Sequence, residues 1–236
     1  MSESSHGYYL EGDFMGRISA VLFDMDGVLV DSEPVITEAA LRALKEWGIN
    51  AKPSDFREFT GMGEDRFVGG VSEKYNVSYT LDMKQKAYEI YLTIVEDKIV
   101  IYPDTVAVLK ELRDIDLKLA LASAADMIKV DANLRAARID RGMFGTILSG
   151  NDVVNKKPAP DVYKLAAKKV GCAPENCVVV EDAISGLAAA HAAGMLCICV
   201  TTSFTEEKFR EKGADYICTD IGGVPKGIEF LNARYN

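Results

Sequence analysis

Six short apolar runs are spaced along the chain, and each has the length of a strand rather than of a helix. They occupy residues 18–23, 117–122, 146–149, 177–180, 196–200 and 216–218. Apolar residues at helical spacing follow the second run, at Met127, Val130, Leu134 and Ala137, and similar patterns follow the third and fourth runs. The pattern therefore predicts strands that alternate with helices.

One of these runs indicates how the sheet is covered. Val178, Val179 and Val180 are adjacent, so both faces of that strand carry apolar side chains. Strands of this kind belong to parallel sheets that have helices on each side. We predict an α/β protein with a doubly wound parallel sheet.

Residues 34–101 have a different pattern: four amphipathic stretches of helical spacing occur there in place of short apolar runs. The first stretch begins at Pro34, a residue suited to the first turn of a helix, and ends at Gly48. Pro103 marks the return to the alternating pattern. We predict an α-helical insertion at residues 34–101, a core made of residues 17–33 and 102–236, and a polar extension at residues 1–16.

The charge of the chain bears on its partners. Its 27 basic and 36 acidic residues give a formal net charge of −9, which argues against nucleic acid or an anionic membrane as the main partner. No apolar run approaches the length of a membrane span, and the opening residues lack the basic start and the apolar block of a secretory signal. We expect a cytoplasmic protein, a monomer or a weak homo-oligomer, that acts on a small molecule.

The five cysteines indicate neither a disulfide framework nor a zinc site, because their number is odd and no CxxC spacing occurs. Cys197 and Cys199 would point to the same side of one strand, which leaves a metal or redox pair as an alternative. The only histidines, His6 and His191, are not near this pair in the sequence. Buried reduced thiols are the favoured interpretation.

Candidate chemistry begins at the end of the first apolar run. Asp24 and Asp26 follow it directly, at alternate positions that can bring both side chains to one side, and Gly27 lets the backbone turn sharply. Ligands of open parallel sheets bind beyond the carboxyl ends of the strands. The pair alone is equally typical of a solvated acidic turn.

A second acidic pair, Glu181 and Asp182, ends the run at residues 177–180. Four acidic side chains would then meet at one edge of the sheet, where they repel one another unless a cation neutralises them. Oxygen ligands favour Mg²⁺, which keeps several waters and also binds substrate phosphate oxygens. We therefore predict a magnesium site and a phosphorylated substrate.

Two other strand ends supply groups that bind phosphate. Ser123 offers a hydroxyl beside the backbone N–H of Ala124, and Lys157 offers a positive charge. Each residue alone has a common alternative role, such as a helix start or an exposed lysine. Their joint placement at strand ends favours a site.

These four motifs, "DMDGV", Ser123, Lys157-Pro158 and Glu181-Asp182, resemble those of the haloacid dehalogenase superfamily, in the same order and over almost the whole chain after Gly16. The resemblance implies a Rossmann-like core with an inserted α-helical cap. It also implies that Asp24 is the nucleophile that attacks phosphorus and that Asp26 is the general acid and base.

The resemblance further implies the ligands of the phosphoryl group and of the metal ion. Ser123, Ala124 and Lys157 would hold the phosphoryl oxygens. The ligands of Mg²⁺ would be Asp24, the backbone carbonyl of Asp26, Glu181 and Asp182. Asp26 also favours phosphoryl transfer, since the dehalogenases lack an aspartate at this spacing.

Within the superfamily, "DGVLVDSEP" is most similar to the β-phosphoglucomutase-like group, whose small cap closes over the site. Sugar phosphomutases of that group carry a histidine on the first cap helix, whereas residues 35–37 here contain none. Gly61 and Gly63 would form a hinge or a close-approach loop, and Arg66 would either reach the substrate or lie exposed on a helix.

The sequence thus predicts a magnesium-dependent phosphatase of small phosphorylated metabolites, most simply sugar phosphates. A β-phosphoglucomutase-type phosphomutase is the alternative. A regulator that binds a phosphorylated metabolite without catalysis is a minor alternative, because Asp24 and Asp26 are both present.

Overall fold

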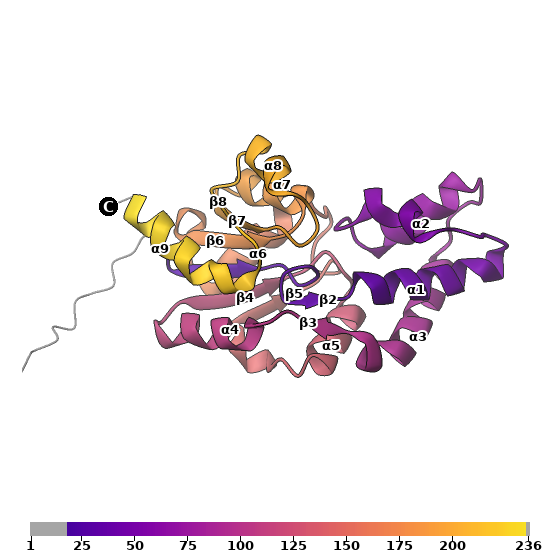
Figure 1. Cartoon of the computed structure of the whole chain (residues 1–236), viewed down its shortest axis with the longest axis horizontal. Coiled ribbons are helices and arrows are strands. Elements are labelled where there is room, and N and C mark those ends of the chain that lie inside the picture. Colours follow the sequence, from indigo (N-terminus) through magenta and orange to yellow (C-terminus); the bar gives the residue numbers. More distant parts are fainter. Residues whose placement is uncertain (1–17, 235–236) are drawn as a thin grey trace, which may run out of the picture.

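The computed structural model describes residues 18–234, so the predicted extension at residues 1–16 lies outside the described residues. Six parallel strands form the main sheet in the order β5-β4-β1-β6-β7-β8 (Figure 1). Their bounds are β1 Ala20–Phe23, β4 Lys118–Ala122, β5 Thr146–Leu148, β6 Cys177–Glu181, β7 Leu196–Val200 and β8 Tyr216–Cys218. The six apolar runs of the sequence are these strands, and the predicted α/β fold is confirmed.

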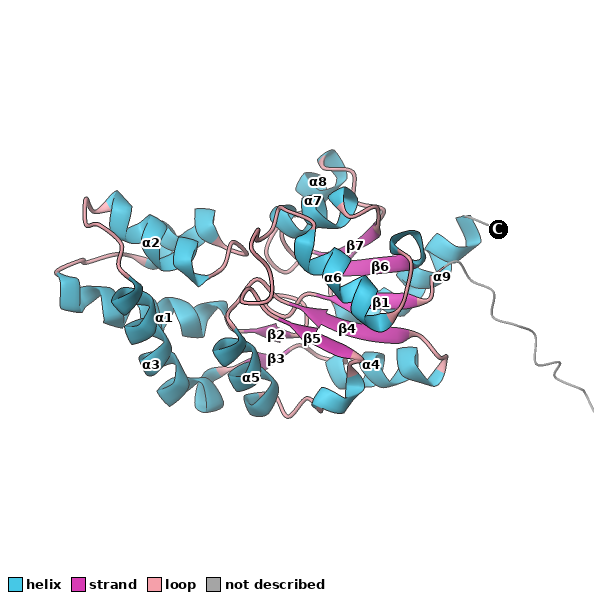
Figure 2. Cartoon of the chain, turned by 180° about the vertical axis from the view of Figure 1, so that it is seen from behind, coloured by secondary structure: helices cyan, strands magenta, loops and turns pink. Residues whose placement is uncertain are grey.

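Helices cover both faces of the sheet, as Figure 2 shows. Val21 and Phe23 of β1 pack into one hydrophobic cluster, and Ala20 and Leu22 pack into the cluster on the opposite face. This alternation is the period of a strand, in which neighbouring side chains point to opposite faces. The first cluster is covered by α4 (Thr105–Asp114), α5 (Met127–Ala136) and α9 (Val224–Arg234), and the second by α6 (Asp161–Val170), α7 (Ile184–Ala192) and α8 (Glu206–Glu211).

A group of helices from the inserted segment lies at one end of the molecule, beyond the carboxyl ends of the strands (Figures 1 and 2). Its side chains form a hydrophobic cluster of their own, which includes Phe56, Val68 and Tyr91. The group consists of α1 (Glu33–Leu44), α2 (Glu64–Lys74), α3 (Leu81–Lys98) and the 3-10 helices η1 (Lys45–Trp47) and η2 (Pro53–Phe59). Other 3-10 helices are η3 (Arg141–Met143), η4 (Pro174–Asn176) and η5 (Ile221–Gly223).

Two short strands that the sequence pattern did not reveal join the inserted helices to the sheet. β2 (Val30–Asp31) pairs antiparallel with β3 (Val100–Ile101). We expected no strand between Pro34 and about Ile101, and this was wrong for the last two residues, which form β3. Strands of two residues are too short to show an alternating pattern of apolar residues.

Helix α5 packs in two directions. Its Val130 and Leu134 belong to the cluster that contains Val21 and Phe23 of β1, whereas Ala132 belongs to the cluster of the inserted helices. The helix therefore contacts the two hydrophobic clusters with different faces. Among residues 18–234, no helix has the length and apolar character needed to cross a membrane.

Candidate active site

Asp24 lies directly after β1, the strand between β4 and β6. Its backbone N–H donates to the carbonyl oxygen of Val180 at 3.0 Å, which extends the ladder between β1 and β6 to this residue. The side chain is 6% exposed, and its Oδ1 lies 2.5 Å from Nζ of Lys157. Burial raises the pKa of Asp24 to about 7, although the charge of Lys157 opposes the shift.

Lys157 precedes α6, and its Nζ also lies 2.7 Å from Oε1 of Glu181. Burial by itself would lower the pKa of this ammonium, but the carboxylates of Asp24 and Glu181 raise the pKa above its ordinary value. The lysine is therefore held as a cation between two acids from neighbouring strands.

Glu181 ends β6, and its two oxygens accept four hydrogen bonds. Oε1 accepts from Lys157 and, at 2.7 Å, from the hydroxyl of Tyr163. Oε2 accepts from the backbone N–H groups of Asp182 and Ala183, each at 2.9 Å. Gly186 allows this approach, since a Cβ there would lie 1.7 Å from Oε1. Glu181 is thus fixed rigidly beside Asp24.

Asp182 is buried, and its Oδ2 accepts a hydrogen bond from the hydroxyl of Ser203. Burial and the neighbouring charges of Glu181 and Asp24 raise its pKa well above the ordinary value. Gly27 lies against this carboxylate with φ of 82°, and a Cβ on Gly27 would lie 1.8 Å from Oδ2. The glycine therefore serves both the backbone turn and the space for Asp182.

Asp24, Glu181 and Asp182 form a compact cluster of oxygen ligands. One ligand atom from each lies within 4.8 Å of the others, and all three side chains are buried. Lys157 is the only cation that contacts this cluster among the described residues, so negative charge is in excess. Such a set of donors fits a hard divalent cation such as Mg²⁺.

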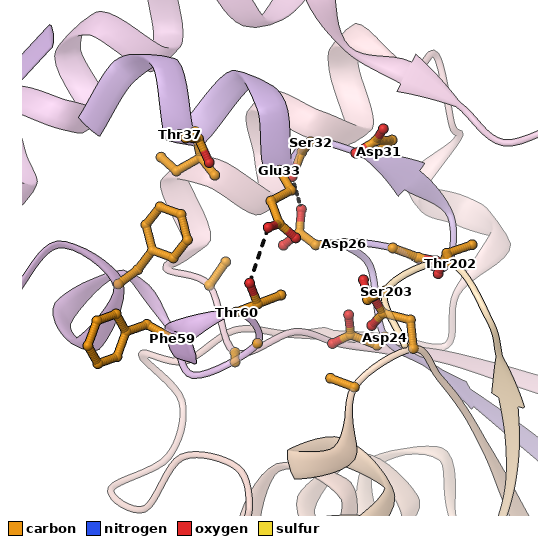
Figure 3. A pocket seen from close by; sticks show the side chains of 18 of the residues that line it. Asp24, Asp26, Asp31, Ser32, Glu33, Thr37, Phe59, Thr60, Thr202 and Ser203 are labelled. Atoms are coloured by element: carbon orange, nitrogen blue, oxygen red, sulfur yellow. Dashed lines mark hydrogen bonds between the residues drawn. The ribbon is translucent and has the colours of Figure 1, made fainter. Parts of the chain in front are cut away.

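Asp26 lies two residues beyond Asp24, but its carboxylate has different partners. Oδ1 accepts from the hydroxyl of Ser32 and, at 3.1 Å, from Nδ2 of Asn133, while Oδ2 lies 2.9 Å from Nζ of Lys129. Figure 3 shows Asp26 pointing toward Ser32, at the start of α1, and away from Asp24. The prediction that four acidic side chains meet was therefore wrong for Asp26: three form the cluster, and the Asp26 side chain is instead held by groups at the start of α1 and on α5.

The residues predicted to bind phosphate lie at the same edge. Ser123 follows β4, and its Oγ accepts from the backbone N–H of Ala125 at 3.1 Å. Ser123, Ala124 and Lys157 line a cavity of about 1030 Å³ between the sheet and the inserted helices. The cavity is also lined by Asp24, Asp26, Glu181, Asp182, Gly61 and Gly63.

The two cap glycines approach the core loops closely. A Cβ on Gly61 would lie 3.0 Å from Cβ of Ala183, and one on Gly63 would lie 2.9 Å from the carbonyl oxygen of Ala124. Both glycines have positive φ, 77° and 81° respectively. Of the two roles expected from the sequence, the geometry shows the close-approach loop.

The third predicted cap contact, Arg66, is placed differently. Its side chain is half exposed, forms an ion pair of 3.3 Å with Glu73 and lies over the ring of Phe59. Arg66 does not line the cavity. The cap side of the cavity instead presents Glu33, whose Oε1 accepts from the hydroxyl of Thr60 at 3.1 Å (Figure 3). Burial raises the pKa of Glu33 above its ordinary value.

Several side chains at the site were not found from the sequence. Tyr163 and Ser203 hold Glu181 and Asp182, while Lys129 and Asn133 hold Asp26. Serines and tyrosines have too many ordinary roles to be selected from a sequence alone. Lys129 and Asn133 are polar residues within a helix whose apolar positions gave the stronger signal.

Comparison of the sequence with known protein families identifies the family of this chain. Residues 18–194 match the family model described as haloacid dehalogenase-like hydrolase, which is most of the chain. The chain belongs to this family. The superfamily inferred from the four motifs is thereby confirmed.

Relatives of this haloacid dehalogenase-like hydrolase differ in length and in name. "Protein SUPPRESSOR OF QUENCHING 1, chloroplastic" of Arabidopsis thaliana is 42% identical over 216 residues, which cover 90% of this chain but 20% of that protein. The chain thus spans about a fifth of that relative. "Phosphorylated carbohydrates phosphatase" of Thermotoga maritima is 30% identical over 179 residues, covering 75% of this chain and 82% of the relative.

A solved structure extends the comparison to the whole fold. The β-phosphoglucomutase of Clostridium difficile has a TM-score of 0.81 at 21% identity, and the match covers 92% of this chain and 98% of that one. At this identity, the likeness shows the fold of the haloacid dehalogenase-like hydrolase and does not identify its reaction.

Proposed function

We propose that this hydrolase is a magnesium-dependent phosphatase that acts on small phosphorylated metabolites through a covalent phosphate on Asp24. One observation carries the proposal: a buried carboxylate, Asp24, lies beside both a buried cation, Lys157, and a cluster of acids suited to a divalent cation, at the wall of a cavity. These are the parts that an anionic nucleophile needs in order to approach an anionic phosphate.

Each step uses residues of this chain. An oxygen of Asp24 attacks phosphorus, the bond between phosphorus and the ester oxygen breaks, and Asp26 gives that oxygen its proton. Asp26, now a carboxylate, takes a proton from a water molecule that attacks the phosphorus of phospho-Asp24. This second step releases inorganic phosphate and restores both residues.

The remaining residues orient the phosphoryl group and balance its charge. Ser123, the N–H of Ala124 and Lys157 would hold its oxygens as the transition state forms. Asp24, the carbonyl of Asp26, Glu181 and Asp182 would hold Mg²⁺, which when bound offsets the repulsion between carboxylate and phosphate. Because both oxygens of Glu181 already accept hydrogen bonds, Asp24 and Asp182 have the less occupied oxygens.

We propose that the inserted segment at residues 34–101 acts as the cap and selects the substrate. Thr60 of this segment presents a hydroxyl to the cavity, and Glu33, which begins α1 just before the segment, presents a carboxylate; both suit the hydroxyl groups of a sugar or polyol. The name of the Thermotoga maritima relative supports the same substrate class. The cytoplasmic location and the monomer or weak homo-oligomer stay predictions.

Hydrolysis is favoured over phosphoryl transfer between two sugar oxygens. The first cap helix contains no histidine at residues 35–37; Val35 and Ile36 are packed in the cluster of the inserted helices, and Thr37 lines the cavity. No side chain at residues 35–37 can therefore exchange a proton with Asp26 as the cap histidine of the mutases would.

The test is phosphate release from hexose, pentose and polyol phosphates, with Mg²⁺ and with EDTA, beside a coupled assay for glucose 6-phosphate formed from β-glucose 1-phosphate. The proposal expects phosphate release that requires Mg²⁺. Glucose 6-phosphate without free phosphate would identify a mutase instead. A protein that binds these esters tightly but turns over none of them would be the regulator.

A further inference from the structure

A second buried lysine, Lys129 of α5, connects Asp26 to the inserted helices. Its side chain is 4% exposed, and its Nζ lies 2.9 Å from Oδ2 of Asp26 and 3.1 Å from Oε1 of Glu64. Asp26 follows β1 of the sheet, whereas Glu64 is the first residue of α2 in the insertion. One ammonium group therefore bridges the general acid of the proposed reaction and the cap.

Glu64 is itself fixed from the cap side. The hydroxyl of Tyr88, on α3, donates to its Oε2 at 3.0 Å, and the Glu64 side chain is 7% exposed. The position of Glu64 is thus determined by the packing of α2 against α3. A displacement of the cap would move Glu64 away from Lys129 and leave that ammonium with one carboxylate.

The charges explain why this position needs a lysine. Asp26 and Glu64 are two acidic side chains that approach the same point, and Glu64 is almost fully buried. Whenever both are ionised, they would repel one another in surroundings of low dielectric constant unless a cation lay between them.

We infer that Lys129 is a positioning residue, which orients the carboxyl group of Asp26 toward the leaving oxygen and couples this orientation to the seating of the cap through Glu64. The inference rests on the proposed phosphatase function. Asp26 must reach the ester oxygen at the moment when the bond to phosphorus breaks, and a displacement of about 1 Å can slow such a step about a hundredfold. Ser32 and Asn133 hold the other oxygen of Asp26, so Lys129 sets the rotation of the carboxyl group.

The chain offers a matched control in Lys84. Its Nζ lies 2.9 Å from Asp65 on α2 and 2.9 Å from Asp126 beside α5, so it also bridges the cap and the core. Neither of these contacts involves Asp26. A change that only loosens the cap should therefore have the same effect at Lys84 as at Lys129.

The test compares Lys129→Met, Lys84→Met and the wild type on phenyl phosphate and p-nitrophenyl phosphate. The two esters have nearly the same shape, but phenolate leaves less readily than nitrophenolate and depends more on a proton from Asp26. The parameter is kcat/KM, which covers the attack by Asp24 and the departure of the alcohol but not the later hydrolysis.

We expect Lys129→Met to lower kcat/KM about tenfold to a hundredfold for phenyl phosphate and less than about threefold for p-nitrophenyl phosphate. Lys84→Met should change both values by the same factor. Glu64→Gln leaves Lys129 beside Asp26. It should also lower kcat/KM more for phenyl phosphate than for p-nitrophenyl phosphate, but the difference between the two losses should be smaller than in Lys129→Met.

Equal losses on the two esters in Lys129→Met would overturn the inference while leaving the phosphatase function intact. A wild type that releases phosphate from neither ester and from none of the sugar and polyol phosphates would overturn the proposed function first, and the inference with it. If Lys129→Met does not fold, as judged by circular dichroism, Lys129→Gln replaces it. Failure of both to fold would show that Lys129 serves the fold and would reject the positioning role.

Discussion

Asp24 and Asp26 are separated by one residue, yet they belong to differently built regions. The contacts of Asp24 come from the sheet and a core loop: the carbonyl oxygen of Val180 on β6 accepts from its N–H, and Lys157, in the loop between β5 and α6, binds its carboxylate. The contacts of Asp26 come from helices, namely Ser32 at the start of α1, and Lys129 and Asn133 on α5. The environment of the proposed nucleophile is therefore complete within the sheet edge, whereas that of the proposed acid depends on the insertion.

The sheet edge and the inserted helices therefore position different parts of the site. Parallel strands fix their carboxyl ends through the hydrogen-bond ladder, and the hydrogen-bond partners of the Asp24, Glu181 and Asp182 side chains lie in the core rather than in the insertion. Asp26 shares Lys129 with Glu64 and so depends on the cap. Under the proposed function, phosphate and the metal ion would be held by the sheet edge, and the acid would be oriented together with the cap.

The largest effect that separates the two aspartates should follow from Asp26→Asn. This change removes the proton donor but leaves the contacts of Asp24 intact. We expect kcat/KM for an alkyl phosphate to fall by about 10²- to 10⁴-fold, with a smaller loss for p-nitrophenyl phosphate. Equal slowing of activated and unactivated esters would argue against the role of Asp26.

A change confined to the sheet edge is Gly27→Ala. The new Cβ would meet Oδ2 of Asp182 at 1.8 Å and displace it. We expect the affinity for Mg²⁺, measured by titration calorimetry, to fall by about 10- to 100-fold. Gly48→Ala is the control, because Gly48 also has positive φ, at 74°, but a Cβ at this position would meet no other group within 4 Å.

Gly48→Ala should cost only the strain of the backbone, about 1 kcal/mol. Its affinity for Mg²⁺ should equal that of the wild type. A similar loss of affinity in both variants would mean that strain, and not the displaced carboxylate, causes the effect.

A smaller effect should appear in the pH dependence of stability. Without metal, burial raises the pKa of Asp24 from 3.8 to about 7. Between these values, the folded chain keeps a proton that the unfolded chain has lost, so the free energy of unfolding decreases as the pH rises through this interval. A shift of this size corresponds to roughly 3–5 kcal/mol.

Binding of Mg²⁺ requires the carboxylate and therefore competes with that proton. We expect Mg²⁺ to raise Tm by several degrees more at pH 8 than at pH 5. Asp24→Asn should reduce this difference. An increase in Tm that is the same at both pH values would contradict the account of Asp24.

The smallest effect is expected from Arg66→Ala. This side chain pairs with Glu73 on the surface and does not line the cavity, so its loss should change kcat/KM less than about twofold. Thr60→Val, which removes a hydroxyl from the cavity wall, is the comparison and should raise KM more than Arg66→Ala does. A tenfold loss in Arg66→Ala would show that the arginine reaches the substrate.

The sequence was most informative at the strand ends. Because parallel strands bring their carboxyl ends to one edge, motifs far apart in the chain can be assigned to one site from the sequence alone. The structure places Asp24, Ser123, Lys157, Glu181 and Asp182 around one cavity. Their roles in binding and catalysis stay predictions.

The contacts between the insertion and the core could not be predicted in this way. Lys129 lies on a helix between apolar positions that indicate a single buried face, and a lysine there is normally exposed. It is buried because α5 packs on two sides, with Ala132 in the cluster of the inserted helices. In the sequence, the small residues Ala132 and Ala136 were the available indication that a second element packs on α5. The strands β2 and β3 were too short to be recognised from the sequence.

The central claim is that Asp24 carries the phosphoryl group during the reaction. The most direct measurement is mass spectrometry of peptides after acid quenching, at early times, of the enzyme mixed with Mg²⁺ and its best substrate. The account predicts a phosphoryl group on the peptide that contains Asp24, and neither this adduct nor phosphate release in Asp24→Asn. Phosphate release by Asp24→Asn at the rate of the wild type would contradict it.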